Sequence, residues 1–234
     1  GAEAFGACRA VRGEDGFATT VGDEGGFAPG VASAEKSFEL LAAAVKKAGY
    51  KLGKDIAFAV DVASSELFDA KQKRYVFRGE GRSYTAGELL KRYLAWQDAY
   101  PFASIEDPFA EDDWKAWTNA LPVLGKKSAI VGDDFLVTNV KRLEKAIREQ
   151  AANAILVKVN QIGTVSEAVD AICLAQRAGW KTSISHRSGE TADTFIADLA
   201  VACGSEYIKT GSLSRSERVE KYNRLLEIEE EMEA

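Results

Sequence analysis

The sequence predicts an α/β fold built from six βα units around a parallel sheet. Short β-branched runs alternate with amphipathic helical runs along the chain, a pattern typical of βα units. The predicted strands are mostly continuous apolar runs, as expected for strands that are covered on both faces. They are IAFAVD (56–61), FASIE (102–106), AIVGD (129–133), AILVKV (154–159), KTSIS (181–185) and EYIK (206–209).

Two of the helices between these strands carry a clear start signal. Thr85 is followed by Glu88, and Thr164 is followed by Glu167. At this spacing each side chain can satisfy a backbone N–H group at the start of a helix, as in a capping box. We therefore expect helices to begin directly after the two threonines.

The remaining segments are assigned from their periodicity and glycine content. A short helix is predicted over 1–12, a glycine-rich turn over 22–30 and an amphipathic helix over 33–48. The first βα unit carries an insertion at about 63–84, and the segment 214–233 is predicted to be a packed helix. No linker or composition shift interrupts the chain, so we expect one domain over 1–234.

Composition excludes several classes of protein. The chain has 234 residues, 46% of them apolar and 28% charged, so a disordered protein is excluded. The net charge of −6 argues against nucleic acid or an anionic membrane surface as a partner. The longest apolar stretches, such as LLAAAV (40–45), fall far short of the roughly 18 residues of a membrane span.

The cysteines and the single methionine bear on location and completeness. Cys8, Cys173 and Cys203 form no CxxC pair and are odd in number, which favours a reducing, cytoplasmic location. The only methionine is Met232, so we expect the chain to be either a processed product or a piece of something longer.

An ionisable residue ends each of the six predicted strands. The carboxyl ends of parallel strands meet at one rim, where active sites of such folds lie. For any single residue, a solvated strand end is about as good an explanation, but six in a row favour a site. The residues are Asp61, Glu106, Asp133, Lys158, His186 and Lys209.

The order of these residues predicts a metal site beside a lysine base. Asp61, Glu106 and Asp133 lie on consecutive strands and offer only oxygen ligands, which suits Mg²⁺ better than Zn²⁺. Lys158 and Lys209 follow on the far side. A lysine near another cation can lose its proton more easily and accept one from carbon.

Two further motifs each allow two interpretations. SHRSGE (185–190) places the sole histidine, His186, before Arg187 and Ser188, whose donors suit a phosphate group. The same residues could instead cap a helix beginning near Thr191. GDEGG (22–26) is either a tight turn or a loop that carries Glu24 close to a ligand.

With these motifs in view, the chain resembles the enolase family. The matching segments run in family order and cover nearly the whole chain, which makes the resemblance far more specific than a short motif. They are VGDEGGFAP (21–29), VDVASSE (60–66), SIEDPFAEDDW (104–114), VGDDFLVTN (131–139), LVKVNQIGT (156–164), SHRSGET (185–191) and IKTGSLSRSER (208–218).

The resemblance implies a lyase, phosphopyruvate hydratase, which reversibly dehydrates 2-phosphoglycerate to phosphoenolpyruvate in glycolysis and gluconeogenesis. It implies that Asp61, Glu106 and Asp133 hold Mg²⁺ and that Lys158 takes the proton from C2. It also implies that Glu24 is the acid that helps the C3 hydroxyl leave as water.

The same resemblance assigns the remaining residues to substrate binding. Lys209 would add positive charge to the developing ene-diolate. Arg187 and Ser188 would bind the phosphate together with a second Mg²⁺, and His186 would line the closed site. The implied partner is a small phosphorylated substrate, and the parent protein is expected to be a homodimer.

The resemblance also implies a TIM-like (β/α)₈ barrel that is truncated at its N-terminus, with about six βα units present. The family's N-terminal domain and first two barrel strands have no counterpart in 1–234. Open parallel edges favour aggregation, so we expect the isolated chain to be inactive or poorly soluble.

Two other functions remain open at this stage. Another Mg²⁺-dependent lyase or racemase of the enolase superfamily would share the three carboxylates without needing SHRSGE or GDEGG. A non-catalytic binding protein is the alternative from a different class, although the net charge of −6 offers no basic surface.

Overall fold

Six parallel strands separated by helices form the framework of the protein, as the sequence predicts. The structure is a computed structural model that describes residues 1–14 and 16–233. Its contacts divide the chain into two compact units. We call Gly53–Thr182 the central unit, and Gly1–Leu52 together with Ser183–Ala234 the terminal unit.

The central unit contains a parallel sheet of four strands in the order β1-β5-β6-β7. Asp61 lies directly beside Glu106 in the register of the first pair. The inner strands are buried throughout or nearly so, which agrees with their continuous apolar sequences. The strands are β1 (Phe58–Asp61), β5 (Phe102–Glu106), β6 (Ala129–Gly132) and β7 (Ala154–Val157).

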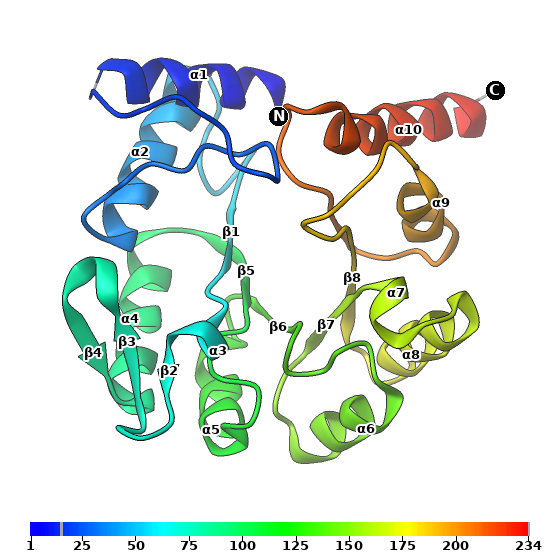
Figure 1. The fold of residues 1–234 in the computed structure, drawn as a ribbon. Helices are drawn as coiled ribbons and strands as arrows, with labels where there is room; N and C mark the ends of the chain where they lie inside the picture. Colours follow the sequence, from blue (N-terminus) through cyan, green and yellow to red (C-terminus); the bar gives the residue numbers. More distant parts are fainter. Residues whose placement is uncertain (15, 234) are drawn as a thin grey trace. The chain divides into compact units, whose positions relative to one another are not determined.

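Helices surround the outside of these strands (Figure 1). Leu89, Trp117 and Leu143 are fully buried and bring apolar stripes of three of the helices into the core. The helices are α4 (Ala86–Ala99), α5 (Trp114–Leu124), α6 (Val140–Glu149) and α8 (Val165–Arg177), with the single turn α7 (Val159–Ile162) after β7.

Both predicted helix starts are confirmed. The Thr85 hydroxyl accepts a hydrogen bond from the Glu88 N–H group, and the Glu88 carboxylate accepts one from the Thr85 N–H group, which completes a capping box before α4. The Thr164 hydroxyl accepts from the Glu167 N–H group before α8. These contacts set the points at which the two helices begin.

The predicted insertion after β1 folds into a small antiparallel sheet. It contains α3 (Ser64–Leu67), β2 (Phe68–Asp69), β3 (Arg74–Phe77), the 3₁₀ turn η1 (Arg78–Glu80) and β4 (Arg82–Tyr84). The Tyr75 hydroxyl donates to Asp113 and accepts from the Ala110 N–H group, which fastens the sheet to the loop after β5.

Non-glycine residues in the left-handed conformation follow three strands of the central unit. Ala63 comes after β1 with φ 47°, Asp107 after β5 with φ 40°, and Thr138 in the loop after β6 with φ 54°. Side chains other than glycine adopt this conformation at a cost. The three loops are therefore held by specific contacts.

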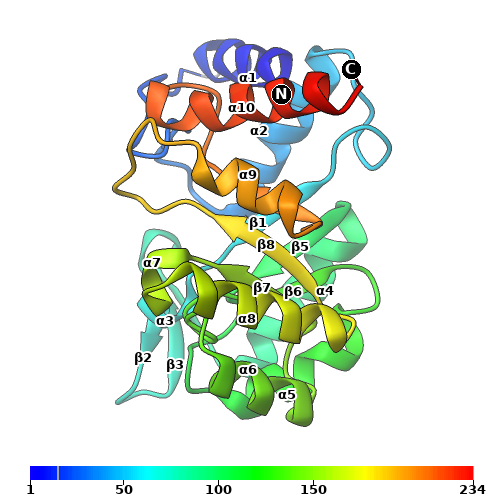
Figure 2. The same cartoon turned by 90° about the vertical axis from the view of Figure 1, so that its right-hand side faces the viewer.

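The terminal unit combines both ends of the chain. α1 (Ala2–Glu14) packs along α2 (Ala34–Lys47), with Val11, Leu40 and Ala44 buried between them. α9 (Phe195–Ala202) contacts α10 (Ser216–Glu233), and the two helices lie side by side in both views (Figures 1 and 2). β8 (Lys181–Ser185), whose last three residues belong to this unit, pairs in parallel with β9 (Tyr207–Lys209).

Several predicted boundaries are off by one or more residues, and two of these errors bear on candidate site residues. The strand predicted over 154–159 ends at Val157, because Lys158 already caps the short helix α7. The helix expected near Thr191 begins only at Phe195, with Thr194 as its N-cap. His186, Arg187 and Ser188 therefore cap no helix, and the structural interpretation of SHRSGE is ruled out.

None of the helices within the described residues is both long enough and apolar enough to cross a membrane.

Candidate active site

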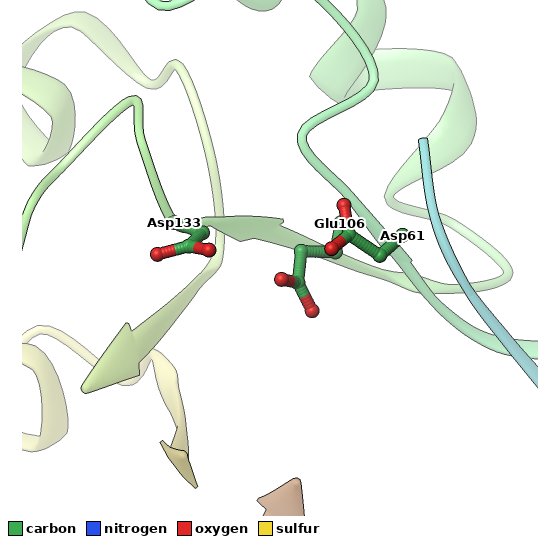
Figure 3. Close-up of side chains that lie close together, drawn as sticks. All are labelled: Asp61, Glu106 and Asp133. Atoms are coloured by element: carbon green, nitrogen blue, oxygen red, sulfur yellow. The ribbon is translucent and has the colours of Figure 1, made fainter. Parts of the chain in front are cut away.

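Three carboxylates gather at the ends of neighbouring strands in the central unit. Asp61 ends β1, Glu106 ends β5 and Asp133 directly follows β6 (Figure 3). One carboxylate oxygen from each lies within 4.8 Å of the others. Glu106 and Asp133 are buried and Asp61 is exposed. This is the arrangement predicted from the strand ends.

The donor set fits a divalent cation. All ligand atoms are carboxylate oxygens, which Mg²⁺ prefers. The Oδ1 atom of Asp133 is buried and has no hydrogen-bond partner, whereas its Oδ2 atom accepts a hydrogen bond from Lys158 Nζ at 2.5 Å. Because a buried carboxylate oxygen without a partner is costly, Asp133 is poised to receive a cation at Oδ1.

Asp107 holds the loop that carries Asp133. Its two carboxylate oxygens accept hydrogen bonds from the N–H groups of Asp133, at 2.9 Å, and Asp134, at 2.8 Å. Burial raises the pKa of Asp107 to about 7; the two N–H donors oppose this shift, and the charge of Asp133 adds to it. Asp107, Asp133 and Asp134 form a second group of acids within metal-binding reach, sharing Asp133 with the first.

Aromatic packing supports the same loop from behind. The ring of Phe135 stacks on Trp117 with 4.0 Å between centroids and an angle of 11°. Arg142 Nε donates to the Phe135 carbonyl at 2.6 Å. The position of Asp133 therefore depends on α5 and α6 as well as on the sheet.

Thr138 fixes the backbone at Lys158. Its buried hydroxyl accepts a hydrogen bond from the Lys158 N–H group at 3.0 Å and lies 3.1 Å from Gln161 Oε1, to which it donates. The Lys158 side chain thus starts from a fixed point beside Asp133. An amine held this way can act as a base toward a substrate bound at the carboxylates.

A second group of predicted residues forms in the terminal unit. Glu24 Oε2 lies 3.5 Å from His186 Nε2, and Ser188 Oγ donates to Glu24 Oε1 at 3.3 Å. His186 is buried, whereas about half of the Glu24 side chain is exposed. The two motifs GDEGG and SHRSGE therefore meet, although they are far apart in the sequence.

Lys209 and Arg187 adjoin this group through the backbone. The His186 N–H group donates to the Lys209 carbonyl at 2.9 Å, and the Arg187 carbonyl accepts from Arg218. Burial lowers the pKa of His186, opposed by the charge of Glu24 and reinforced by the charges of Arg218 and Lys209. The histidine is therefore neutral near pH 7.

Two glycines allow the loops of this group to approach closely. Gly25 has φ +74°, and a Cβ atom there would lie 2.1 Å from the Ser214 carbonyl oxygen. Gly211 has φ +86°, and its Cβ would lie 2.8 Å from the Glu24 carbonyl oxygen. Larger residues at either position would displace the loop that carries Glu24.

Comparison with models of known protein families shows to which family the chain belongs. The model of the enolase C-terminal TIM barrel domain matches residues 1–234. The chain belongs to the enolase family. Its six parallel strands with intervening helices are thus βα units of a TIM-type barrel, a fold that has eight units when complete. Enolases are lyases, and the acidic groups of this chain have the composition of a metal site.

All nine candidate residues are placed in the two units. The central unit brings together Asp61, Glu106, Asp133 and Lys158. The terminal unit brings together Glu24, His186 and Ser188, with Arg187 exposed and Lys209 at the end of β9.

Sequence reasoning missed Asp107, Asp134, Thr138 and Arg218. Asp107 and Asp134 each follow a predicted ligand, so the acidic pairs in SIED and VGDD were a usable signal. The prediction took only the acidic residue at the end of each strand, Glu106 or Asp133, and left its acidic neighbour unused. Thr138 and Arg218 lie within the matched segments 131–139 and 208–218, but nothing there distinguishes them from their neighbours.

Proposed function

We propose that this chain is the catalytic barrel domain of an enolase that converts 2-phospho-D-glycerate reversibly to phosphoenolpyruvate and water with Mg²⁺. This is a step of glycolysis and gluconeogenesis. The observation that carries the proposal is the group of three carboxylates with Lys158 Nζ 2.5 Å from one of them. It combines a site for a hard cation with an amine that can take a proton.

The difficulty of this reaction explains why both parts are needed. Removing a proton beside a carboxylate builds a second negative charge on that carboxylate. Asp61, Glu106 and Asp133 would hold a Mg²⁺ ion, which would supply the positive charge that offsets it. The chain's contribution is to hold the three ligands in place, through the strands and through Asp107.

Lys158 is the proposed base for the C2 proton. It accepts the proton as a neutral amine. Its Nζ atom lies 2.5 Å from Asp133 Oδ2, beside one of the carboxylates that would hold the cation. The fixed backbone at Thr138 keeps the amine beside the carboxylates throughout.

The residues of the terminal unit are proposed to act on the rest of the substrate. Glu24 gives its proton to the C3 hydroxyl, which leaves as water as the C2–C3 double bond forms. Arg187 and Ser188 bind the phosphate, for which a guanidinium fork and a hydroxyl are suitable donors. Lys209 stabilises the ene-diolate, and His186 lines the site beside Glu24.

An assay of the protein encoded by the complete reading frame tests this function. We expect 2-phosphoglycerate to be converted to phosphoenolpyruvate with Mg²⁺, activity to be lost in EDTA, and activity to return when Mg²⁺ is added. Absence of Mg²⁺-dependent phosphoenolpyruvate formation would contradict the proposal. Turnover of an unphosphorylated hydroxy acid instead would indicate another reaction of the superfamily.

A further inference from the structure

Arg218 is a buried cation at the centre of the terminal unit. It lies in the first turn of α10 and its side chain is fully buried. Its Nη1 atom lies 2.7 Å from His186 Nδ1 and donates to the Arg187 carbonyl at 2.8 Å. Its Nη2 atom donates to the carbonyls of Asp23, at 3.0 Å, and Ser188, at 2.6 Å. One guanidinium therefore ties the loop of Glu24 to the loop of Ser188.

The contact with His186 has a chemical consequence. A guanidinium has donors only and no acceptor, so His186 Nδ1 must accept and carries no proton. In the neutral ring the proton is then on Nε2. That atom is buried and lies 3.5 Å from Glu24 Oε2. Arg218 thus determines which ring nitrogen presents an N–H group to Glu24.

The surrounding charges keep the ring neutral. The groups that act on it are Glu24, Arg218, Lys209 and Glu190. The two cations oppose a third positive charge and the two carboxylates favour one, while burial disfavours the charged ring. The neutral ring with its proton on Nε2 is the state that results.

The loop after β9 packs closely against Arg218. A Cβ atom on Gly211 would lie 2.7 Å from the Arg218 Cδ atom. The Tyr222 hydroxyl, one turn further along α10, donates to the Gly211 carbonyl at 2.5 Å. The position of this loop is thus fixed by its contacts with Arg218 and Tyr222.

We infer that Arg218 is a positioning residue for the dehydration, which holds His186 as the neutral Nε2–H tautomer with that N–H group directed at Glu24. The inference rests on the proposed function. When Glu24 gives its proton to the leaving hydroxyl, the Nε2–H group stabilises the carboxylate that remains. Arg218 contacts no reacting atom in this scheme and acts through His186 and the two loops.

The test reads the tautomer directly, by ¹⁵N NMR of labelled histidine. His186 is the only histidine in the 234 residues. In a longer protein it is identified as the resonance missing from His186→Gln. We expect Nδ1 to be the unprotonated nitrogen in the wild type at pH 7.5. In Arg218→Met we expect a mixture of both tautomers and a raised pKa of His186.

Activity supplies a second readout. Arg218→Lys keeps the charge but cannot make all four contacts. We expect its kcat to fall about 10- to 100-fold with KM changed less than about threefold, as is usual for residues that orient a catalytic group. Arg224→Lys is the matched control on the same helix, because Arg224 pairs with Asp198, Glu227 and Glu231 away from His186. It should leave both the tautomer and kcat unchanged.

Three results would overturn the inference. These are a proton on Nδ1 in the wild type, an imidazolium at pH 7.5, and a tautomer unchanged in both Arg218 variants. Should Arg218→Met fail to fold, the wild-type and Arg218→Lys spectra still decide the question. Because the spectra need no substrate, the inference can fail while the proposed function stands, and the reverse also holds.

Discussion

In the central unit the candidate catalytic side chains stand on or directly beside strands, whereas in the terminal unit most of them stand on loops. Asp61 and Glu106 are neighbours in the register of β1 and β5, and Asp133 directly follows β6. The loops of Glu24 and Ser188 are held by the buried side chain of Arg218, which lies on α10. A strand end is fixed by the sheet itself, and a loop must be fixed by something else.

The two groups of residues should therefore respond differently to the loss of one side chain. In the central unit the loss of one side chain should remove one chemical role and leave the fold intact. In the terminal unit the loss of one buried hydrogen-bond donor should disturb several groups together. The predictions below separate these two behaviours.

The largest effect is expected for Lys158→Ala. Removing a general base typically lowers the rate about 10²- to 10⁴-fold. Because the three carboxylates do not depend on Lys158, Mg²⁺ binding measured by calorimetry should persist. Lys127→Ala is the control, since Lys127 is exposed and pairs with Asp98. A variant that keeps more than a tenth of wild-type kcat would show that Lys158 is not the base, and a binding protein without catalysis would be unaffected by either change.

A smaller effect, on stability, is expected for Asp107→Asn. An amide offers one acceptor oxygen in place of two, so one of the N–H groups of Asp133 and Asp134 loses its partner. A buried unpaired donor costs about 1–3 kcal/mol, which urea denaturation would measure.

The neighbouring exposed acid provides the control for this change. Asp112→Asn alters an exposed carboxylate that lies 3.6 Å from Arg142, and it should change the free energy of unfolding by no more than about 0.5 kcal/mol. Equal effects of the two variants would show that Asp107 does not hold the loop.

Sequence reasoning reached the strand-end residues because their positions follow from the strands alone. Apolar runs locate each strand, and the first charged residue after the run then stands at the rim. The same reasoning found Lys158 although its strand ends two residues earlier than predicted. The fold class and both helix caps could also be predicted, because they depend on local sequence.

What the sequence could not show depends on contacts between distant segments. Arg218 is one of many charged residues in its segment, and only the folded chain brings it to His186 at 2.7 Å. Asp107 hydrogen-bonds to backbone groups 26 and 27 residues later. The antiparallel sheet of the insertion was missed because its strands are only two to four residues long.

The smallest effect concerns the pH dependence of stability through His186. Its pKa is lowered in the folded protein, mainly by burial. The unfolded chain therefore binds more protons between the ordinary value of about 6.5 and the folded pKa. Stability from this group is present above pH 6.5 and is lost as the pH falls from 6.5 toward the folded pKa.

The histidine's contribution is isolated by comparison with His186→Gln. The thermal midpoints of the wild type and the variant would be measured between pH 8 and pH 5. As the pH falls, the wild type should lose stability relative to the variant. A difference in midpoint that stays constant across this range would show that His186 is not held neutral.

The left-handed residues after β1, β5 and β6 have a consequence for protein engineering. Each holds a conformation that costs a non-glycine residue about 1–2 kcal/mol, and glycine is the usual remedy. Asp107 and Thr138 cannot be replaced in this way, because their side chains hold the Asp133 loop and Lys158. Ala63 makes its hydrogen bonds through its backbone, since its N–H group donates to Asp61 and its carbonyl accepts from the Glu66 N–H group. Of these three positions, Ala63 is therefore the one at which a change to glycine could improve thermostability without removing a side chain that holds the candidate active site.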